Sequence, residues 1–151
     1  MNATFTSGFN LQNYYRNLHH VSSLKYDSDV AQLAQTHADY LKKTNKFEHS
    51  HLVDARGRTV GQNIFVVWGA IKNNSEIISL AVKKWYREKA LYNFNTPGYS
   101  QQTGHFTQLV WKNTSLCGTG FARDNDKAIV VMNYYPPGNY INEFRNNVFP
   151  I

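Results

Sequence analysis

The sequence predicts an α+β fold in which helices pack on a mostly antiparallel sheet. Apolar residues recur at helical spacing in the first part of the chain, whereas short β-prone runs separated by turn residues dominate the last third. Helices followed by consecutive strands with short connections are typical of an antiparallel sheet covered by helices. The 151 residues suffice for one domain with its own core, so residues 1–151 are expected to form a single domain.

Three helices are expected. The first covers residues 11–18, where apolar side chains lie three and four positions apart and Asn10 is a suitable cap. The second covers residues 30–41 and is opened by acidic and hydroxyl residues at 27–29, near the positive end of the helix. The third begins at Ser75, and its apolar face, which includes Trp85, places Glu88 at the inner end of the stripe.

Four strands are expected, at residues 63–68, 105–111, 118–122 and 128–135. Each is rich in β-branched and aromatic residues, and the composition of Asp124, Asn125 and Asp126 predicts a hairpin turn between the last two. No internal repeat or linker interrupts this order. The predicted helices and strands therefore belong to one continuous unit.

The charge is moderately basic, because 16 Lys and Arg residues oppose 10 Asp and Glu residues, a net charge of +6. The cations are scattered and form no dense arm, so nucleic acid is not expected as a partner, whereas an anionic membrane surface is compatible. Only Cys117 is present, which excludes an intramolecular disulfide and favours a reducing, intracellular compartment. Neither a leader nor a run of about 20 apolar residues is found; secretion would require an upstream segment already removed.

Several motifs together resemble the CAP superfamily of cysteine-rich secretory, antigen 5 and pathogenesis-related proteins. They are the run 105–111 (HFTQLVW), the run 133–140 (NYYPPGNY), and the shorter motifs at 13–16, 48–50, 61–63 and 85–88. The single cysteine makes the chain most similar to the cysteine-poor, Golgi-associated plant pathogenesis-related type. This resemblance implies a three-layer α-β-α sandwich and, for that type, a peripheral membrane location.

The resemblance also implies a tetrad of two histidines and two acids. Matched position by position, the tetrad is His49, Gln62, Glu88 and His105, so a glutamine replaces one acid. His49 and His105 are suitable zinc ligands, and Glu88 is the residue left to act as a base. Loss of one negative charge is expected to weaken zinc binding. The alternative is a polar network whose members simply satisfy one another's hydrogen bonds.

The aromatic segment around Pro136 is a candidate wall of a ligand groove. Family likeness points to Tyr134, Tyr135, Pro136 and Tyr140, although a stable turn alone also explains the prolines and glycine. Of the other polar candidates, His37 is expected to be a packed histidine, His19 and His20 to favour the negative end of the first helix, and Cys117 to be a small core residue. His51 is a weaker candidate for a metal ligand beside His49.

Three functions follow. The first is a non-enzymatic protein that binds a sterol, fatty acid or phospholipid and associates with anionic membranes. The second is a zinc-dependent hydrolase that uses His49, His105 and Glu88. The third is a self-associating or partner-binding module, including a homodimer, because residues 63–68 and 128–135 are apolar and β-prone; burial of both strands is the alternative.

Overall fold

A computed structural model describes residues 1–50, 52–69 and 72–151. Its centre is a four-stranded sheet with the strand order β1-β3-β4-β2. The strands are β1 (Lys25–Tyr26), β2 (Gly61–Trp68), β3 (Leu116–Arg123) and β4 (Lys127–Tyr135). Strand β1 is parallel to β3, whereas β3 with β4 and β4 with β2 are antiparallel. The mostly antiparallel sheet is confirmed.

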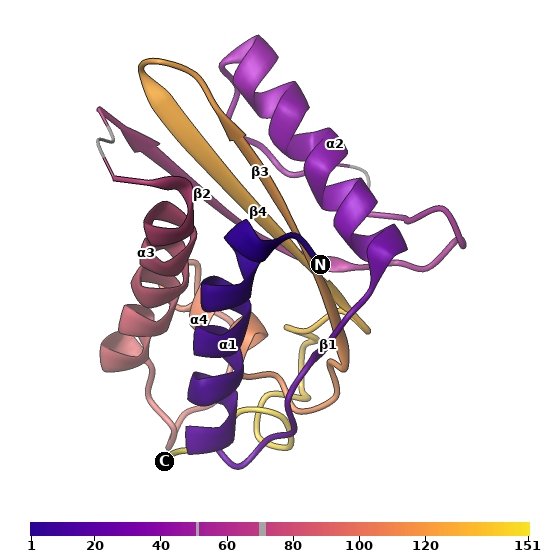
Figure 1. Cartoon of the computed structure of the whole chain (residues 1–151). Helices are drawn as coiled ribbons and strands as arrows, with labels where there is room; N and C mark the ends of the chain where they lie inside the picture. The colour runs from indigo at the N-terminus through magenta and orange to yellow at the C-terminus, as the bar shows by residue number, and fades with distance from the viewer. Residues whose placement is uncertain (51, 70–71) are drawn as a thin grey trace.

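Helices cover both faces of the sheet. They are α1 (Ala3–Leu18), α2 (Ser28–Thr44), α3 (Asn74–Arg87), the short 3-10 helix η1 (Glu88–Leu91) and α4 (Gly104–Leu109). Figure 1 shows α2 on one face, with α1, α3 and α4 on the other. The α+β class and the three-layer α-β-α sandwich are therefore confirmed. None of the described helices is long and apolar enough to cross a membrane.

Successive side chains of β4 point to opposite faces of the sheet and so divide the core into two clusters. Ile129 and Val131 face α2 and pack with a small cluster from that helix, whereas Val130 and Met132 face the α1 and α3 layer. On the α2 side the layers lie very close, because a Cβ at Gly118 would meet the backbone of α2 at 2.1 Å. A side chain at this position would force α2 away from the sheet.

Two helix starts follow from local capping. The side chain of Asp27 accepts hydrogen bonds from the backbone of residues 29 and 30, as expected for the second helix. The first helix begins earlier than predicted, at Ala3, and its cap is Asn2 instead of Asn10. Phe5 and Phe9 in this extra segment pack against the main core, which accounts for its helical conformation.

Residues 105–111 do not form the predicted strand. Residues 104–109 form α4, in which Phe106 and Leu109 are three positions apart and both buried. The run is rich in aromatic and β-branched residues, so its propensity favours a strand, but tertiary contacts override that preference. The prediction for this segment was wrong.

The other three strands and the hairpin turn between β3 and β4 are confirmed, whereas β1 was not predicted. The sequence analysis gave burial of both apolar strands as the alternative to self-association. Strand β4 meets that expectation, because it is central and almost wholly buried. Strand β2 is instead an edge strand, and Trp68 at its end is 64% exposed. Of the two strands expected to be apolar and β-prone, only β2 therefore has an edge open to pairing with a second copy.

Candidate functional site

The first pair of the predicted tetrad is Glu88 and His105, at the start of α4. Glu88 Oε2 lies 2.8 Å from His105 Nδ1, and Glu88 Oε1 accepts the backbone N–H groups of His105 and Phe106, each at 3.0 Å. The carboxylate thus takes the place of a helix cap, because Thr103 at the cap position makes no side-chain cap bond. Both side chains are partly exposed, at 20% for Glu88 and 33% for His105.

The second pair is His49 and Gln62. His49 Nδ1 lies 2.9 Å from Gln62 Oε1, which also accepts the backbone N–H of Ser50 at 3.3 Å. The amide nitrogen of Gln62 donates to Ser50 Oγ at 3.2 Å and to Asn133 Oδ1 at 2.9 Å. All four hydrogen-bonding positions of the Gln62 amide are therefore used. The buried Gln62 side chain fixes the loop that carries His49.

Strand β2 connects the two pairs. Gln62 faces the α2 side of the sheet, like Ile64, whereas Asn63 faces the opposite side. The amide nitrogen of Asn63 donates to His105 O at 3.1 Å and to the Tyr134 hydroxyl at 3.4 Å. Among the described residues, no hydrogen bond joins the His49 pair directly to the His105 pair. The tetrad therefore forms two pairs linked through adjacent residues of β2.

The ring geometry fixes one tautomer at both histidines. Each Nδ1 faces an oxygen acceptor, so a neutral ring carries its proton on Nδ1 and its lone pair on Nε2. A histidine oriented by a carbonyl or carboxylate in this way suits metal coordination. Residues 1–50, 52–69 and 72–151 nevertheless contain no group of three or more histidines, cysteines or acids placed to hold a metal. This conformation does not fit a three-ligand zinc site, and His51 lies outside the described residues.

The model of the cysteine-rich secretory protein family, CAP, matches residues 9–134. The chain belongs to the CAP family. It is 37% identical over 141 residues to the human Golgi-associated plant pathogenesis-related protein 1, an alignment covering 91% of this chain and 87% of the human protein. It is 33% identical to yeast PRY2, with 97% of this chain but only 41% of the yeast protein covered.

Solved structures share the fold of this CAP domain. The structure of NaASP2 with Zn²⁺ has a TM-score of 0.72 at 22% identity, covering 93% of this chain and 84% of that one. The Schistosoma mansoni venom allergen-like protein 4 has a TM-score of 0.71 at 19% identity, covering 93% and 92% of the two chains. At these low sequence identities, the similarity to the solved structures shows a shared fold only.

A groove opens beside His49 on the α2 side of the CAP domain. It has a volume of about 640 Å³ and lies between the exposed side of α2 and the loop at residues 48–50. The lining residues are Leu33, Thr36, His37, Tyr40, Glu48, His49 and Ser50. The Tyr40 hydroxyl donates to Glu48 Oε1 at 3.1 Å, which joins the two walls of the groove.

The predicted aromatic wall is only partly at the surface. Tyr134 is fully buried in β4, and its hydroxyl contacts the side chain of Gln12, so its ring has no surface for a ligand. Tyr135 and Pro136 are half-buried, and Tyr140 is 51% exposed. Tyr134 lies within the strand predicted at 128–135, and β4 is buried on both faces up to this position.

Two other histidines are core residues. His37 is buried, as expected, and its Nε2 lies 2.6 Å from Glu48 O. His19 does not simply favour the helix end, since it is buried with Nδ1 at 2.6 Å from Phe149 O and Nε2 at 2.8 Å from the Tyr86 hydroxyl. Burial lowers the pKa of both rings.

Sequence reasoning missed the residues that support the tetrad. Asn63 and Asn133 are buried amides, and Ser50 makes two hydrogen bonds to Gln62. All three residues lie within the quoted motifs at 48–50, 61–63 and 133–140, but the motifs do not tell which side chains these residues contact. Cys117 is confirmed as a core residue, because it is fully buried and burial raises the pKa of its thiol to about 12.

Proposed function

We propose that this CAP protein is a non-enzymatic lipid-binding protein that associates with anionic membranes. The groove beside His49 carries the proposal: a sterol, fatty acid or phospholipid lies along α2, with its polar group toward the loop at 48–50. The volume of about 640 Å³ falls within the range of small-molecule sites, roughly 300–1,000 Å³.

The lining of this groove suits an amphiphile. Leu33 and the ring of Tyr40 provide apolar surface from one side of α2, at positions seven apart and therefore on the same face. Glu48, His49 and Ser50 provide polar groups on the opposite wall. A ligand with an apolar body and a hydroxyl or carboxyl group matches this division, because each part then meets surface of its own kind.

The tetrad supports binding over catalysis. Both oxygens of Glu88 already accept hydrogen bonds from α4, so this carboxylate orients His105 instead of facing a water. Gln62 cannot ionise, which removes the second acid. Cys117 is buried with a raised pKa and is no nucleophile.

Lipid capture in solution tests the groove. Purified protein is titrated with a fluorescent fatty acid and, separately, with a fluorescent sterol, at low and at high salt. Saturable binding that salt leaves nearly unchanged is expected for a pocket, since screening acts on exposed charges. Leu33→Glu is expected to abolish that binding by placing a charge on the apolar wall.

Leu91→Glu is the matched control, because Leu91 is 65% exposed and belongs to η1, outside the groove. The two variants have the same chemical change, but Leu33 is half-buried, so the free energy of unfolding of each is measured to separate a loss of stability from a loss of binding. Equal loss of lipid binding in both variants, or none in Leu33→Glu, would contradict the assignment of the groove.

Weak zinc binding is the second candidate, favoured by the Nδ1 contacts that leave the Nε2 lone pair of His49 and of His105 for a metal. Calorimetric titration of chelator-stripped protein, with His105→Ala as the control, measures this directly. Heat that persists in His105→Ala is surface binding and removes the candidate, whereas heat lost in that variant supports it.

The proposed location is intracellular, peripheral to a membrane. The single cysteine and the net charge of +6 support this location, as does the Golgi-associated relative by its name. Fractionation of cells that express the chain with a small tag tests it: release from membranes by high salt is expected, whereas recovery from the medium would indicate secretion.

A further inference from the structure

Positive charge is concentrated on the layer formed by α1 and α3. Residues 72–89 contain five cations, Lys72, Lys83, Lys84, Arg87 and Lys89, but only two acids, Glu76 and Glu88. Helix α1 contains no acidic residue at all. Glu88 is engaged with α4, so Glu76 is the one acid of these two segments that is exposed. Residues 72–89 therefore carry a higher density of positive charge than the chain as a whole.

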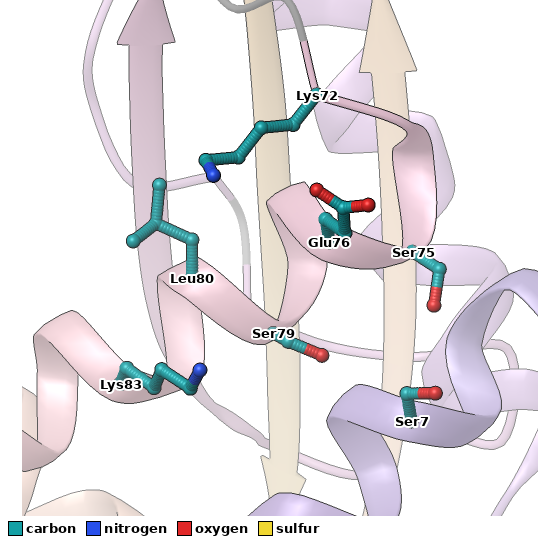
Figure 2. A pocket seen from close by; sticks show the side chains of 7 residues that line it. All are labelled: Ser7, Lys72, Ser75, Glu76, Ser79, Leu80 and Lys83. Atoms are coloured by element: carbon teal, nitrogen blue, oxygen red, sulfur yellow. The ribbon is translucent and has the colours of Figure 1, made fainter.

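A pocket of about 370 Å³ lies between the two helices on this face. Figure 2 shows Ser75 and Ser79 on successive turns of α3 and Ser7 on the neighbouring turn of α1, with Lys72 and Lys83 above and below in this view. Three hydroxyl groups and two ammonium groups, all of them hydrogen-bond donors, thus line this pocket. These are the groups that bind phosphate oxygens at protein surfaces.

Neither lysine is committed elsewhere. Among the residues that the structure describes, Lys72 and Lys83 form no ion pair, whereas Arg56 and Arg58 are paired with acids. Arg123 donates to Lys72 O at 2.7 Å, which brings a further cation to the same end of α3. The charges of this pocket are therefore available to a ligand.

The remaining wall carries one negative charge. Glu76 Oε1 accepts a hydrogen bond from Asn73 Nδ2 at 2.8 Å, while Asn73 Oδ1 accepts the backbone N–H of Glu76 at 2.9 Å. This reciprocal cap fixes the start of α3. It also places a carboxylate beside the pocket, where it opposes any anion.

We infer that the α1 and α3 face docks on an anionic phospholipid bilayer, with a headgroup phosphate in the pocket between Lys72 and Lys83. This inference rests on the membrane association proposed above and names the surface that makes it. Charge complementarity decides the partner, because two lysines without an ion pair among the described residues and three hydroxyl groups line the pocket against a single carboxylate. The lipid groove beside His49 lies on the opposite face of the sheet, so docking leaves it open (Figure 1).

Vesicle sedimentation tests the docking face. The probes are vesicles of phosphatidylcholine alone, and vesicles of phosphatidylcholine and phosphatidylserine in equal parts. The double variant Lys72→Gln/Lys83→Gln is expected to bind the anionic vesicles about 30-fold more weakly, since each cation near such a surface contributes about five-fold. Glu76→Gln keeps the helix cap and is expected to bind about five-fold more tightly.

The matched control is Lys42→Gln/Lys43→Gln, which removes the same two charges from the last turn of α2, on the other face. Equal weakening by both double variants would overturn the inference, because net charge alone would then explain binding. Unchanged binding by Glu76→Gln would also count against it. Excess inorganic phosphate is expected to weaken vesicle binding more than sodium chloride of the same ionic strength, because it competes for the pocket. Equal weakening by the two salts would overturn the phosphate pocket.

Two further readouts separate this inference from the proposed function. Absence of anionic vesicle binding by the unaltered protein would defeat the membrane part of the proposed function itself. If the unaltered protein binds and the variants show no preference for this face, only the inference fails. Capture of the fluorescent fatty acid in solution is measured on the same variants, and it is expected to stay unchanged because the groove is on the α2 side.

Discussion

Replacement of Glu88 by alanine tests whether this carboxylate orients His105 and caps α4. The side chain accepts three hydrogen bonds, from His105 N, Phe106 N and His105 Nδ1, at 3.0, 3.0 and 2.8 Å. Hydrogen bonds to a charged group contribute about 1.5–3 kcal/mol each when fully buried. Because this pair is partly exposed, solvent screening reduces the total below the sum of about 4.5 kcal/mol for three bonds at the lower end of that range, and we expect about 3 kcal/mol.

Chemical denaturation measures this loss. For a chain of this size a loss of about 3 kcal/mol lowers the midpoint of thermal unfolding by about 6–12 °C. The control is Glu143→Ala, which removes an exposed carboxylate and is expected to change stability by less than about 0.5 kcal/mol. If Glu88→Ala unfolds together with this control, the carboxylate does not hold α4 and the assignment is refuted.

Glu88→Gln separates orientation of the ring from support of the helix. Its carbonyl oxygen still accepts the two backbone N–H groups, but its amide nitrogen now faces His105 Nδ1. The ring must then carry its proton on Nε2, so nitrogen chemical shifts are expected to report the opposite tautomer at His105. A proton that stays on Nδ1 would show that Glu88 does not select the tautomer.

Three further predictions concern other parts of the chain. Gln62→Glu is expected to reverse the amide of Asn133, whose Nδ2 is buried without a partner, since the carboxylate can only accept; a crystal structure checks this. The variant is also expected to weaken capture of an anionic fatty acid, because it adds a negative charge beside the groove; the capture assay measures this. Burial lowers the pKa of His19 and of His37, so the unfolded chain binds a proton first at each ring and stability falls as pH drops below about 6.5, by at most about 1.4 kcal/mol per pH unit for each ring. Denaturation at successive pH values measures this, and His19→Gln should remove the part that His19 contributes. The thiol of Cys117, with its pKa raised to about 12, is expected to react with thiol reagents only after unfolding, so rapid labelling of the native protein would contradict its burial.

The parts of the fold that the sequence predicted are those with a strong local pattern. Helix α2 combines an acidic cap at Asp27 with an unbroken apolar stripe, and β4 combines β-branched residues with a turn before it. The start of α1 was missed because Phe5 and Phe9 become a helical stripe only when a core is present to bury them. Helix α4 was missed for a similar reason, since Glu88 supplies its cap from a distant part of the chain.

The site was predicted at the level of residue types but not of contacts. Family likeness brought His49, Gln62, Glu88 and His105 together, and the structure places them in two pairs. Which pairs form depends on the register of β2 against β4, which sets Gln62 opposite Asn133. No local pattern encodes a register between segments so far apart, so the supporting amides were beyond sequence reasoning.

The glutamine at position 62 has a consequence beyond the loss of a charge. A carboxylate only accepts hydrogen bonds, whereas this amide accepts from His49 Nδ1 and Ser50 N while it donates to Ser50 Oγ and Asn133 Oδ1. Both ends of the amide therefore hold the loop at 48–50, and that loop is one wall of the groove along α2. A carboxylate at position 62 would increase the attraction for a cation. The amide instead makes hydrogen bonds that hold the loop at 48–50 in place. Gln62 thus holds the wall of the groove on which the proposed lipid binding depends.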